Sequence, residues 1–143
     1  MTNTPSKIVY TARASVTGGR TGRARAESGR LDLQLDRPQE QGGKGEGTNP
    51  EELFALGYGA CFQGALGAVA GKQGIDTSGS ELDIAVGFGP ESNSFGLAVD
   101  ITVTIPGVDD ETAQQLVEAA HQFCPYSKAT RGNIPVTVTG KAA

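Results

Sequence analysis

A long helix without charge is the feature of this chain that most constrains its fold. No charged residue occurs between Leu53 and Gly71. Apolar side chains fall on every face of this predicted helix, and one row of them consists of Phe54, Tyr58, Phe62 and Leu66. A helix that is apolar all round is buried in a protein core or in a membrane. The rest of the chain therefore has to provide a cover for this helix.

The start of the helix is marked by its first residues. Asn49 is a favourable N-cap, and Pro50 suits the first helical position, where no N–H is needed. Glu51 and Glu52 fill the first turn, where carboxylates meet the positive end of the helix dipole. The sequence thus predicts a helix within residues 47–72.

The uncharged run is almost long enough to span a membrane, which takes about 20 apolar residues. Gln63 interrupts it, however, and glycines recur along it at positions 57, 59, 64, 67 and 71. Because glycine has no side chain, it lets a neighbouring backbone approach closely. Amphipathic segments flank the helix on both sides. We interpret it as the central helix of a globular domain and expect no membrane as a partner.

Alternating polar and apolar residues predict strands before and after the helix. The alternating segments are residues 7–16, 21–27, 31–35, 81–88, 95–105 and 134–139. Ser28 and Gly29 join two of them in a hairpin. The predicted turn of a second hairpin contains Gly89, Pro90, Asn93 and Ser94.

A second, amphipathic helix is predicted near the end of the chain. Asp109 or Asp110 caps it, and it should end at Cys124, because Pro125 disfavours helical backbone in the residue before it. The order of strands, long helix, strands, helix and strand lacks the regular alternation of a doubly wound sheet. We therefore expect an α+β fold with a mainly antiparallel sheet packed on the long helix, in a single domain of residues 1–143.

Composition limits the setting in which the chain works. Its 143 residues include two cysteines, too few for the disulfide framework of a small secreted protein. No signal peptide is recognisable, so we expect a reduced, cytoplasmic protein. Eight of the twelve Lys and Arg residues lie between Lys7 and Lys44, but without interleaved aromatic residues that would stack on bases. We interpret them as a solvated strand face and expect no nucleic-acid partner.

A glycine-rich connection, residues 37–48, leads into the long helix. It lacks the GxxxxGK[ST] pattern of a phosphate-binding loop, and no strand directly precedes the helix. We interpret it as a mobile loop or lid.

One modest sheet cannot easily cover an all-apolar helix on every side. Two copies of the chain could bury each other's long helices between two sheets. We therefore expect an obligate homodimer.

Cys61 lies in the middle of the long helix, and two explanations for it are open. Free cysteine often packs in a core as a small apolar residue. A reactive cysteine at this place would need a nearby cation, because neither end of the helix dipole is close. Arg20 is the best candidate for that cation, since the glycines of GGRTG leave room for a guanidinium to enter a pocket.

An arginine in a pocket needs a carboxylate to fix its fork. Glu51 is a candidate, but it lies ten residues before Cys61, which is about 15 Å on a straight helix and excludes direct contact. Glu51 could act on the site by orienting Arg20, through a bend at Gly57 or Gly59, or from another subunit.

Cys124 ends the second helix beside a proline, where it could be a mobile partner that condenses with a sulfenic acid on Cys61. His121 lies three residues earlier. These three side chains could supply a zinc site, but no CxxC or HExxH pattern is present, and we expect no metal. We interpret His121 as a surface or interface residue.

Three separated motifs resemble those of one protein family. They are GGRTG near the start, GTNPEELFALGYGACFQGAL in the long helix and HQFCPYSKATRGNIPVTV near the end. In this order they resemble the organic hydroperoxide resistance (Ohr) proteins of the OsmC/Ohr superfamily. The early GGR and the segment CPYSKATRGNI are similar to the Ohr branch, while KGEGTNPEEL also resembles the OsmC branch.

The resemblance implies a peroxiredoxin-like thiol peroxidase that reduces organic hydroperoxides, including those of fatty acids, to alcohols without a cofactor. It implies that Cys61 is the peroxidatic cysteine and that Cys124 resolves it in an intramolecular disulfide. Arg20 would polarise the thiolate and the peroxide, and Glu51 would hold that arginine. The resemblance also implies an intertwined homodimer, with active sites at the subunit interface, that is recycled by dihydrolipoamide or a lipoylated protein.

Other functions stay open beside this one. An OsmC-branch peroxidase would use a broader range of peroxides. A non-catalytic lipid-binding module would hold its lipid with the apolar helix and the glycine-rich loop, and its cysteines would only pack. A redox-sensing regulator would bind nucleic acid through the basic N-terminal half, although no recognition motif is present.

Overall fold

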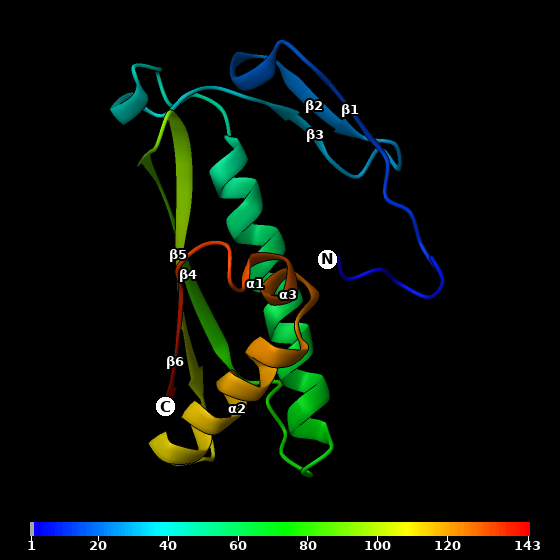
Figure 1. The fold of residues 1–143 in the computed structure, drawn as a ribbon, viewed down its shortest axis with the longest axis vertical. Helices are drawn as coiled ribbons and strands as arrows, with labels where there is room; N and C mark the ends of the chain where they lie inside the picture. Colours follow the sequence, from blue (N-terminus) through cyan, green and yellow to red (C-terminus); the bar gives the residue numbers. More distant parts are fainter. Residues whose placement is uncertain (1) are drawn as a thin grey trace. The chain divides into compact units, whose positions relative to one another are not determined.

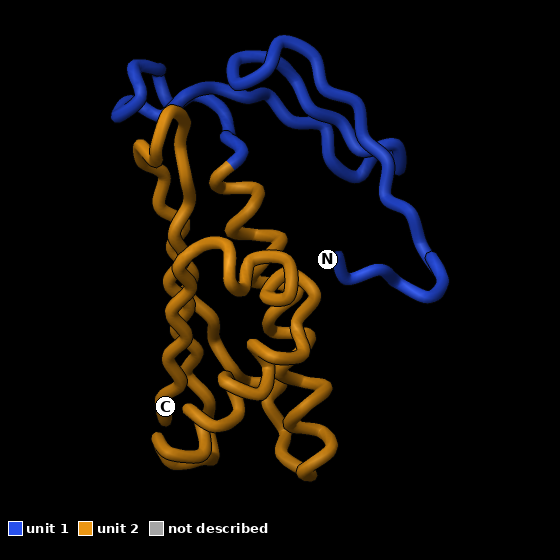
Figure 2. The backbone as a smooth tube through the Cα atoms, in the orientation of Figure 1, with its two compact units in different colours: residues 1–50 blue, residues 51–143 orange. Residues whose placement is uncertain are grey.

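The computed structural model of the chain describes residues 2–143, which divide into two compact units (Figure 2). The first unit ends at Pro50, and the second runs from Glu51 to Ala143. Their helices and strands confirm the expected α+β class. That residues 1–143 form a single domain stays a prediction.

The first unit is a three-stranded antiparallel sheet with the strand order β1-β2-β3. Its elements are β1 (Ala14–Thr17), the 3-10 turn η1 (Gly19–Thr21), β2 (Arg23–Ala26), β3 (Asp32–Gln34) and the 3-10 turn η2 (Gln39–Gln41). The predicted turn at Ser28 and Gly29 joins β2 to β3. The predicted strand 7–16 is wrong over most of its length, because residues 8–12 pair with no strand of the described chain. An extended segment becomes a strand only where a neighbour completes its hydrogen bonds.

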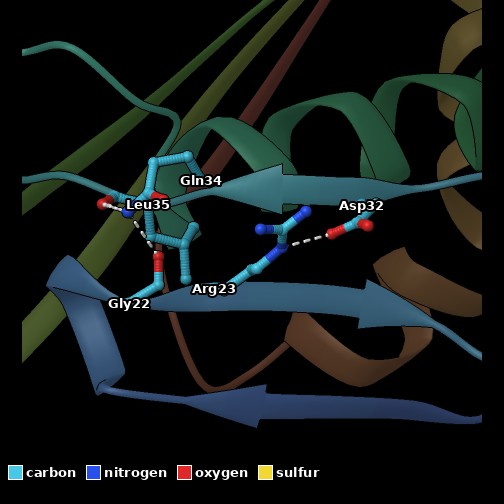
Figure 3. Close-up of polar contacts among 5 residues, drawn as sticks. All are labelled: Gly22, Arg23, Asp32, Gln34 and Leu35. Carbon is cyan, nitrogen blue, oxygen red and sulfur yellow. Dashed lines mark hydrogen bonds and ion pairs between the residues drawn. The ribbon is translucent and has the colours of Figure 1, made fainter.

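Polar contacts between strands fix the register of this sheet (Figure 3). The Nε of Arg23 donates to Oδ1 of Asp32 at 2.7 Å, and this contact lowers the pKa of the Asp32 carboxyl. The carbonyl of Gly22 accepts the side-chain amide of Gln34 at 2.9 Å and the backbone N–H of Leu35 at 2.8 Å. Because an exposed ion pair adds little stability, the carbonyl contacts and the ladder determine the register. Arg23 lies on a solvated strand face, as predicted.

The glycine-rich connection between β3 and α1 (Pro50–Gly71) is folded around Asp36. The carboxylate of Asp36 accepts the backbone N–H groups of Arg37, Lys44 and Glu46 at 2.9, 3.2 and 3.1 Å. These donors, Glu46 foremost, hold the pKa of Asp36 below its usual value. The connection therefore has hydrogen bonds of its own, and its movement as a lid stays a prediction.

The first unit buries little of its own apolar surface. Among its described residues Leu35 is the one buried hydrophobic side chain. Ile8, Val9 and Tyr10 are 64%, 88% and 79% exposed within the single chain. A small sheet needs a hydrophobic face that packs against something to be stable. This unit therefore depends on packing beyond its own strands.

The second unit places helices on one side of a second three-stranded sheet (Figure 1). Besides α1 its elements are β4 (Glu81–Glu91), β5 (Ser94–Ile105), α2 (Asp110–Phe123), α3 (Pro125–Thr130) and β6 (Val136–Ala142). The strand β5 pairs antiparallel with β4 and parallel with β6. The largest fully buried side chains of its core are Tyr58, Phe62, Leu66, Val99, Ile101, Val103, Ile105, Leu116 and Val117.

The turn of the β4–β5 hairpin is tighter than predicted. Gly89 and Pro90 belong to β4, and the turn consists of Ser92 and Asn93, with Ser92 in the left-handed region at φ 52°. In the described sheet β4 pairs on one side only, so Pro90 can lie in this strand without breaking a ladder on the other side. The paired strands therefore continue beyond the predicted ends.

A helix that the sequence analysis does not predict follows α2. Asp109 caps α2 and accepts the N–H of Thr112 at 2.8 Å. The helix ends at Phe123, and Cys124 leaves the helical conformation with φ −64° and ψ 126°, as predicted from the following proline. Pro125 is then the first residue of α3, a position where proline is favourable. The residue that stops one helix therefore starts the next.

The prediction that α1 is buried on every side is wrong for the single chain. Phe62 and Leu66 are fully buried, whereas Leu56 on the opposite side is 70% exposed. The exposed side continues with small residues, namely Ala60, Gly64, Gly67 and Ala68. Within residues 2–143 only α1 is long and apolar enough to cross a membrane, a test that core helices of soluble proteins also pass. The second unit by itself thus leaves one apolar side of α1 uncovered.

Close packing explains one of the helix glycines clearly. A Cβ at Gly59 would lie 3.2 Å from Cδ2 of Leu82 and 3.4 Å from Cγ2 of Ile84, so this glycine lets α1 approach β4. A Cβ at Gly64 or Gly67 would instead meet no atom within 4 Å.

Candidate functional site

Two cysteines that are far apart in the sequence meet inside the second unit. Cys61 lies in the middle of α1 and is partly exposed, while Cys124 lies between α2 and α3 and is fully buried. Their Sγ atoms are 3.5 Å apart, and both thiols are free. A disulfide needs its sulfurs at about 2.05 Å. A small movement of either side chain is therefore enough to join them.

The backbone at Cys124 places its sulfur toward α1. The N–H of Cys124 still donates to the carbonyl of Ala120 at 2.8 Å and so closes α2. Its Sγ accepts the backbone N–H of Ser127 at 3.5 Å and so caps α3. One residue thus ends one helix and begins the other, and this double role fixes its side chain at the bend.

The electrostatic surroundings of Cys61 within the second unit favour a thiol over a thiolate. Burial raises its pKa most, and the neighbouring Cys124 raises it further. A hydrogen bond from the backbone of Tyr126 acts in the opposite direction and lowers it. The balance is a raised pKa. Residues of this unit alone therefore do not give Cys61 the low pKa that a reactive cysteine needs.

A buried group of hydroxyls lies beside the thiol pair and joins three helices. The Oη of Tyr58 lies 2.8 Å from Oγ of Ser127 and 3.1 Å from Oγ1 of Thr130. The Nδ1 of His121 lies 2.7 Å from the same Ser127 Oγ. Ser127 and Thr130 were not selected from the sequence, although a serine and a threonine three residues apart, shortly after Cys124-Pro125, could have indicated a polar face on a short helix.

His121 is half-buried rather than fully exposed, and a place for it at an interface stays a prediction. Its ring is partly buried and bonds to Ser127, and its carbonyl accepts Nη1 of Arg131 at 2.8 Å. Burial, and then the charge of Arg131, lower the pKa of the imidazole. At neutral pH the ring is therefore uncharged. Within residues 2–143 no three His, Cys, Asp or Glu side chains are grouped to hold a metal ion.

Aromatic side chains border the thiol pair. Tyr126, whose backbone bonds to Cys61, has its ring centroid 6.4 Å from that of Phe54 and 5.8 Å from that of Tyr58. A Cβ at Gly57 would lie 3.3 Å from Oη of Tyr126, so this glycine makes room for the ring. The surroundings of the sulfurs are thus mainly apolar.

Arg20 and Glu51 lie on the elements where the sequence analysis expects them. Arg20 is in η1 of the first unit, in a turn that needs glycine, because a Cβ at Gly22 would lie 1.7 Å from the carbonyl oxygen of Thr17. Glu51 is in the first turn of α1, at the start of the second unit. Of the four predicted site residues, the structure brings Cys61 and Cys124 together within one unit.

The chain is similar over most of its length to known proteins. The family model for OsmC-like proteins matches residues 43–139. An organic hydroperoxide resistance protein of Xanthomonas axonopodis pv. citri is 50% identical over 137 residues, which cover 94% of this chain and 96% of that protein. The organic hydroperoxide resistance protein OhrB of Bacillus subtilis is 43% identical over 130 residues, which cover 90% of this chain and 95% of that protein.

Solved structures share the fold. A crystal structure of an organic hydroperoxide resistance protein from Elizabethkingia anophelis, with thiocyanate bound, has a TM-score of 0.90 at 45% identity and covers 96% of this chain and 99% of its own. A crystal structure of an organic hydroperoxide resistance protein from Vibrio cholerae, with captopril in one of its active sites, has a TM-score of 0.90 at 41% identity. The match covers 99% of this chain and 96% of that protein's chain. The α+β architecture of this chain is therefore that of these proteins.

The hydroxyl of Tyr58 is expected to stabilise the second unit. Tyr58→Phe removes the atom that Ser127 and Thr130 share and leaves both without this buried partner. The free energy of unfolding, measured by urea denaturation, should fall by about 2 kcal/mol. Tyr126→Phe, which changes a partly exposed tyrosine, is the control and should cost much less. An equal loss in both variants would contradict the importance of the buried hydroxyl group.

Proposed function

The chain belongs to the OsmC-like family, among its organic hydroperoxide resistance proteins, and we propose that it is a cysteine-based thiol peroxidase that reduces organic hydroperoxides to alcohols. The observation that carries this proposal is the 3.5 Å separation of the Cys61 and Cys124 sulfurs in a mainly apolar interior. Two free thiols at this distance suit a reaction cycle that passes through a disulfide.

In the proposed cycle the thiolate of Cys61 attacks the distal oxygen of the hydroperoxide. The O–O bond breaks, the alcohol leaves after taking up a proton, and Cys61 becomes a sulfenic acid. The thiol of Cys124 then condenses with the sulfenic acid, which forms the disulfide and releases water. An external dithiol reduces the disulfide by two exchange steps and becomes a disulfide itself. We propose dihydrolipoamide, free or on a lipoylated protein, as this reductant.

Arg20 is proposed to supply the positive charge that Cys61 does not receive from the second unit. Burial and Cys124 raise the pKa of Cys61, so a cation has to act on the sulfur if it is to react as a thiolate at neutral pH. Arg20 is proposed for this part, with Glu51 orienting its guanidinium. The tight glycine turn fixes the backbone from which the side chain of Arg20 extends.

The apolar surroundings of the thiols support an organic substrate. Phe54, Tyr58 and Tyr126 lie together beside them, and such rings suit an alkyl or fatty-acid chain better than the small polar hydrogen peroxide. The proposed chemistry uses the two sulfurs and a dithiol, and we propose that it needs neither a cofactor nor a metal. A cytoplasmic location, where thiols are kept reduced, suits this cycle.

We also propose that the working form is an intertwined homodimer. One side of α1 is apolar and exposed in the single chain, and a groove of about 590 Å³ lies along it between Leu56, Ala60 and Ile84. The first unit buries only Leu35 among its described hydrophobic residues. A second copy could cover both surfaces, since obligate dimer interfaces resemble a domain core cut in half.

The thiol cycle can be tested by mass and thiol counting. One equivalent of an organic hydroperoxide should remove both thiols of the reduced protein and give the mass of an internal disulfide, faster than hydrogen peroxide does. Cys61→Ser should abolish peroxide consumption, whereas Cys124→Ser should allow one reaction and then stop. Full turnover in both variants would contradict the mechanism.

The same experiment separates the alternative functions. Thiols that stay reduced, together with copurified lipid, would favour the lipid-binding alternative. Equal rates with both peroxides would favour the broader OsmC-branch activity.

The contribution of Arg20 can be tested through the pH dependence of Cys61. Removal of a cation disfavours the thiolate, so Arg20→Ala should raise the pKa of Cys61 by about 1–3 units and move its reactivity to higher pH. The measurement is the rate of alkylation of Cys61 against pH in the Cys124→Ser background. Arg23→Ala, which removes an arginine paired with Asp32, is the matched control and should leave the profile unchanged. An unchanged profile in Arg20→Ala would rule out the proposed part of Arg20.

The homodimer can be tested by sedimentation. The protein should sediment as a dimer at micromolar concentration, and Leu56→Asp should shift it toward the monomer, because the variant places a charge on the exposed apolar side of α1. Gln115→Asp, on the exposed side of α2, is the control and should stay dimeric. A monomeric wild-type protein would contradict the proposal.

A further inference from the structure

The first turn of α3 makes a backbone contact with each of the two sulfurs. The backbone of Tyr126 hydrogen-bonds to Cys61, and the N–H of Ser127 donates to Sγ of Cys124 at 3.5 Å. Pro125, the first residue of the turn, has no N–H to give. The position of this one turn therefore affects where both sulfurs lie relative to each other.

A single buried hydroxyl attaches this turn to the other two helices. The Oγ of Ser127 lies 2.8 Å from Oη of Tyr58 on α1 and 2.7 Å from Nδ1 of His121 on α2. Ser127 and Tyr58 have no exposed surface. An unpaired polar atom in such a place is costly, so the three side chains hold one another in a defined geometry.

The number of protons available determines which group donates in each hydrogen bond among these hydroxyls. Each hydroxyl has one proton to donate. Thr130 donates its own to the carbonyl of Ser127 at 3.2 Å, so it accepts the proton of Tyr58. Tyr58 therefore accepts from Ser127, and Ser127 accepts from Nδ1–H of His121. The chain of hydrogen bonds is complete only when the residue at position 121 donates from this place.

We propose that His121 and Ser127 are positioning residues of the thiol cycle, which hold the first turn of α3 so that Cys124 stays close enough to close the disulfide with Cys61. This inference rests on the proposed function. In this proposal His121 takes no direct part in the chemistry. It influences which product forms from oxidised Cys61 after the peroxide has reacted.

The effect concerns a competition at oxidised Cys61. The sulfenic acid either condenses with Cys124 and releases water, or it reacts with a second hydroperoxide, which gives a sulfinic acid and a second alcohol. The first reaction depends on the distance between the sulfurs, and the second depends on the concentration of peroxide. Of these two reactions only the condensation needs the sulfur of Cys124, so a loosened α3 turn slows the condensation relative to the reaction with a second hydroperoxide. The ratio of sulfinic acid to disulfide therefore measures the positioning effect.

The experiment compares the wild type with Ser127→Ala, His121→Ala and His121→Asn at a large excess of organic hydroperoxide. The amide nitrogen of asparagine can take the place of Nδ1–H, whereas alanine has no donor. Intact mass separates the disulfide, with two hydrogens lost, from the sulfinic acid, with two oxygens gained. Lys128→Ala, on the exposed side of the same α3, is the matched control. Thermal unfolding of each variant shows how far overall stability has changed.

We expect a sulfinic-to-disulfide ratio about fivefold higher in Ser127→Ala and His121→Ala, and a ratio near that of the wild type in His121→Asn and Lys128→Ala. If Ser127→Ala does not fold, the comparison of the two His121 variants carries the test. Equal ratios in all variants, with or without a lower unfolding temperature, would overturn the inference and leave the proposed function standing. A wild type that keeps both thiols under the same conditions would overturn the proposed function and this inference with it.

Discussion

The side of α1 that carries Tyr58, Phe62 and Leu66 needs a cover, and the rest of the second unit provides it. Buried residues of β5 and α2, such as Ile101 and Leu116, join Phe62 in a single core, and each buried side chain of this size contributes about 1.5–3 kcal/mol. The same core makes any polar atom on this side of the helix costly unless it is paired. The buried hydroxyl of Tyr58 is hydrogen-bonded to Ser127 of α3. The need to pair this hydroxyl therefore also explains why α3 packs against α1 at Tyr58.

The core that brings the two cysteines together also opposes their chemistry. Burial favours the neutral thiol and raises the pKa of Cys61, which is the reverse of what a nucleophile needs. Under the proposed function, the short distance between the sulfurs and the activation of Cys61 therefore have different sources. The core provides the short distance, and under the proposed function the charge comes from Arg20, which lies in a glycine turn of the other unit.

Elements defined by local signals could be predicted from the sequence. The helix start at Asn49 and Pro50 and the alternation of the strands depend on neighbouring residues, and both are found in the structure. The helix α3 was missed because Pro125 was interpreted only as a stop signal, although proline also suits a helix start. The strand from residue 7 and the burial of α1 were overestimated, because each depends on what another segment or chain packs against it.

For the candidate site, the two cysteines could be predicted from the sequence, but their geometry could not. Cys61 and Cys124 could be selected by residue type and motif, but their distance follows from the packing of α1 against the α2–α3 bend. The hydrogen bond of His121 was not predicted, since its partner Ser127 comes from a helix that was not expected. A hydrogen-bonded group of side chains from three helices has no periodicity that a single sequence could display.

The parallel pairing of β6 with β5 has a consequence for how the chain is made. Parallel strands cannot be joined by a short turn, so β6 reaches its place only after α2 and α3 have crossed over the sheet. Cys124 lies on that crossover, between α2 and α3. While the protein emerges from the ribosome, β4 and β5 can already form their hairpin, but this sheet gains its third strand only after the segment that carries Cys124 has been made.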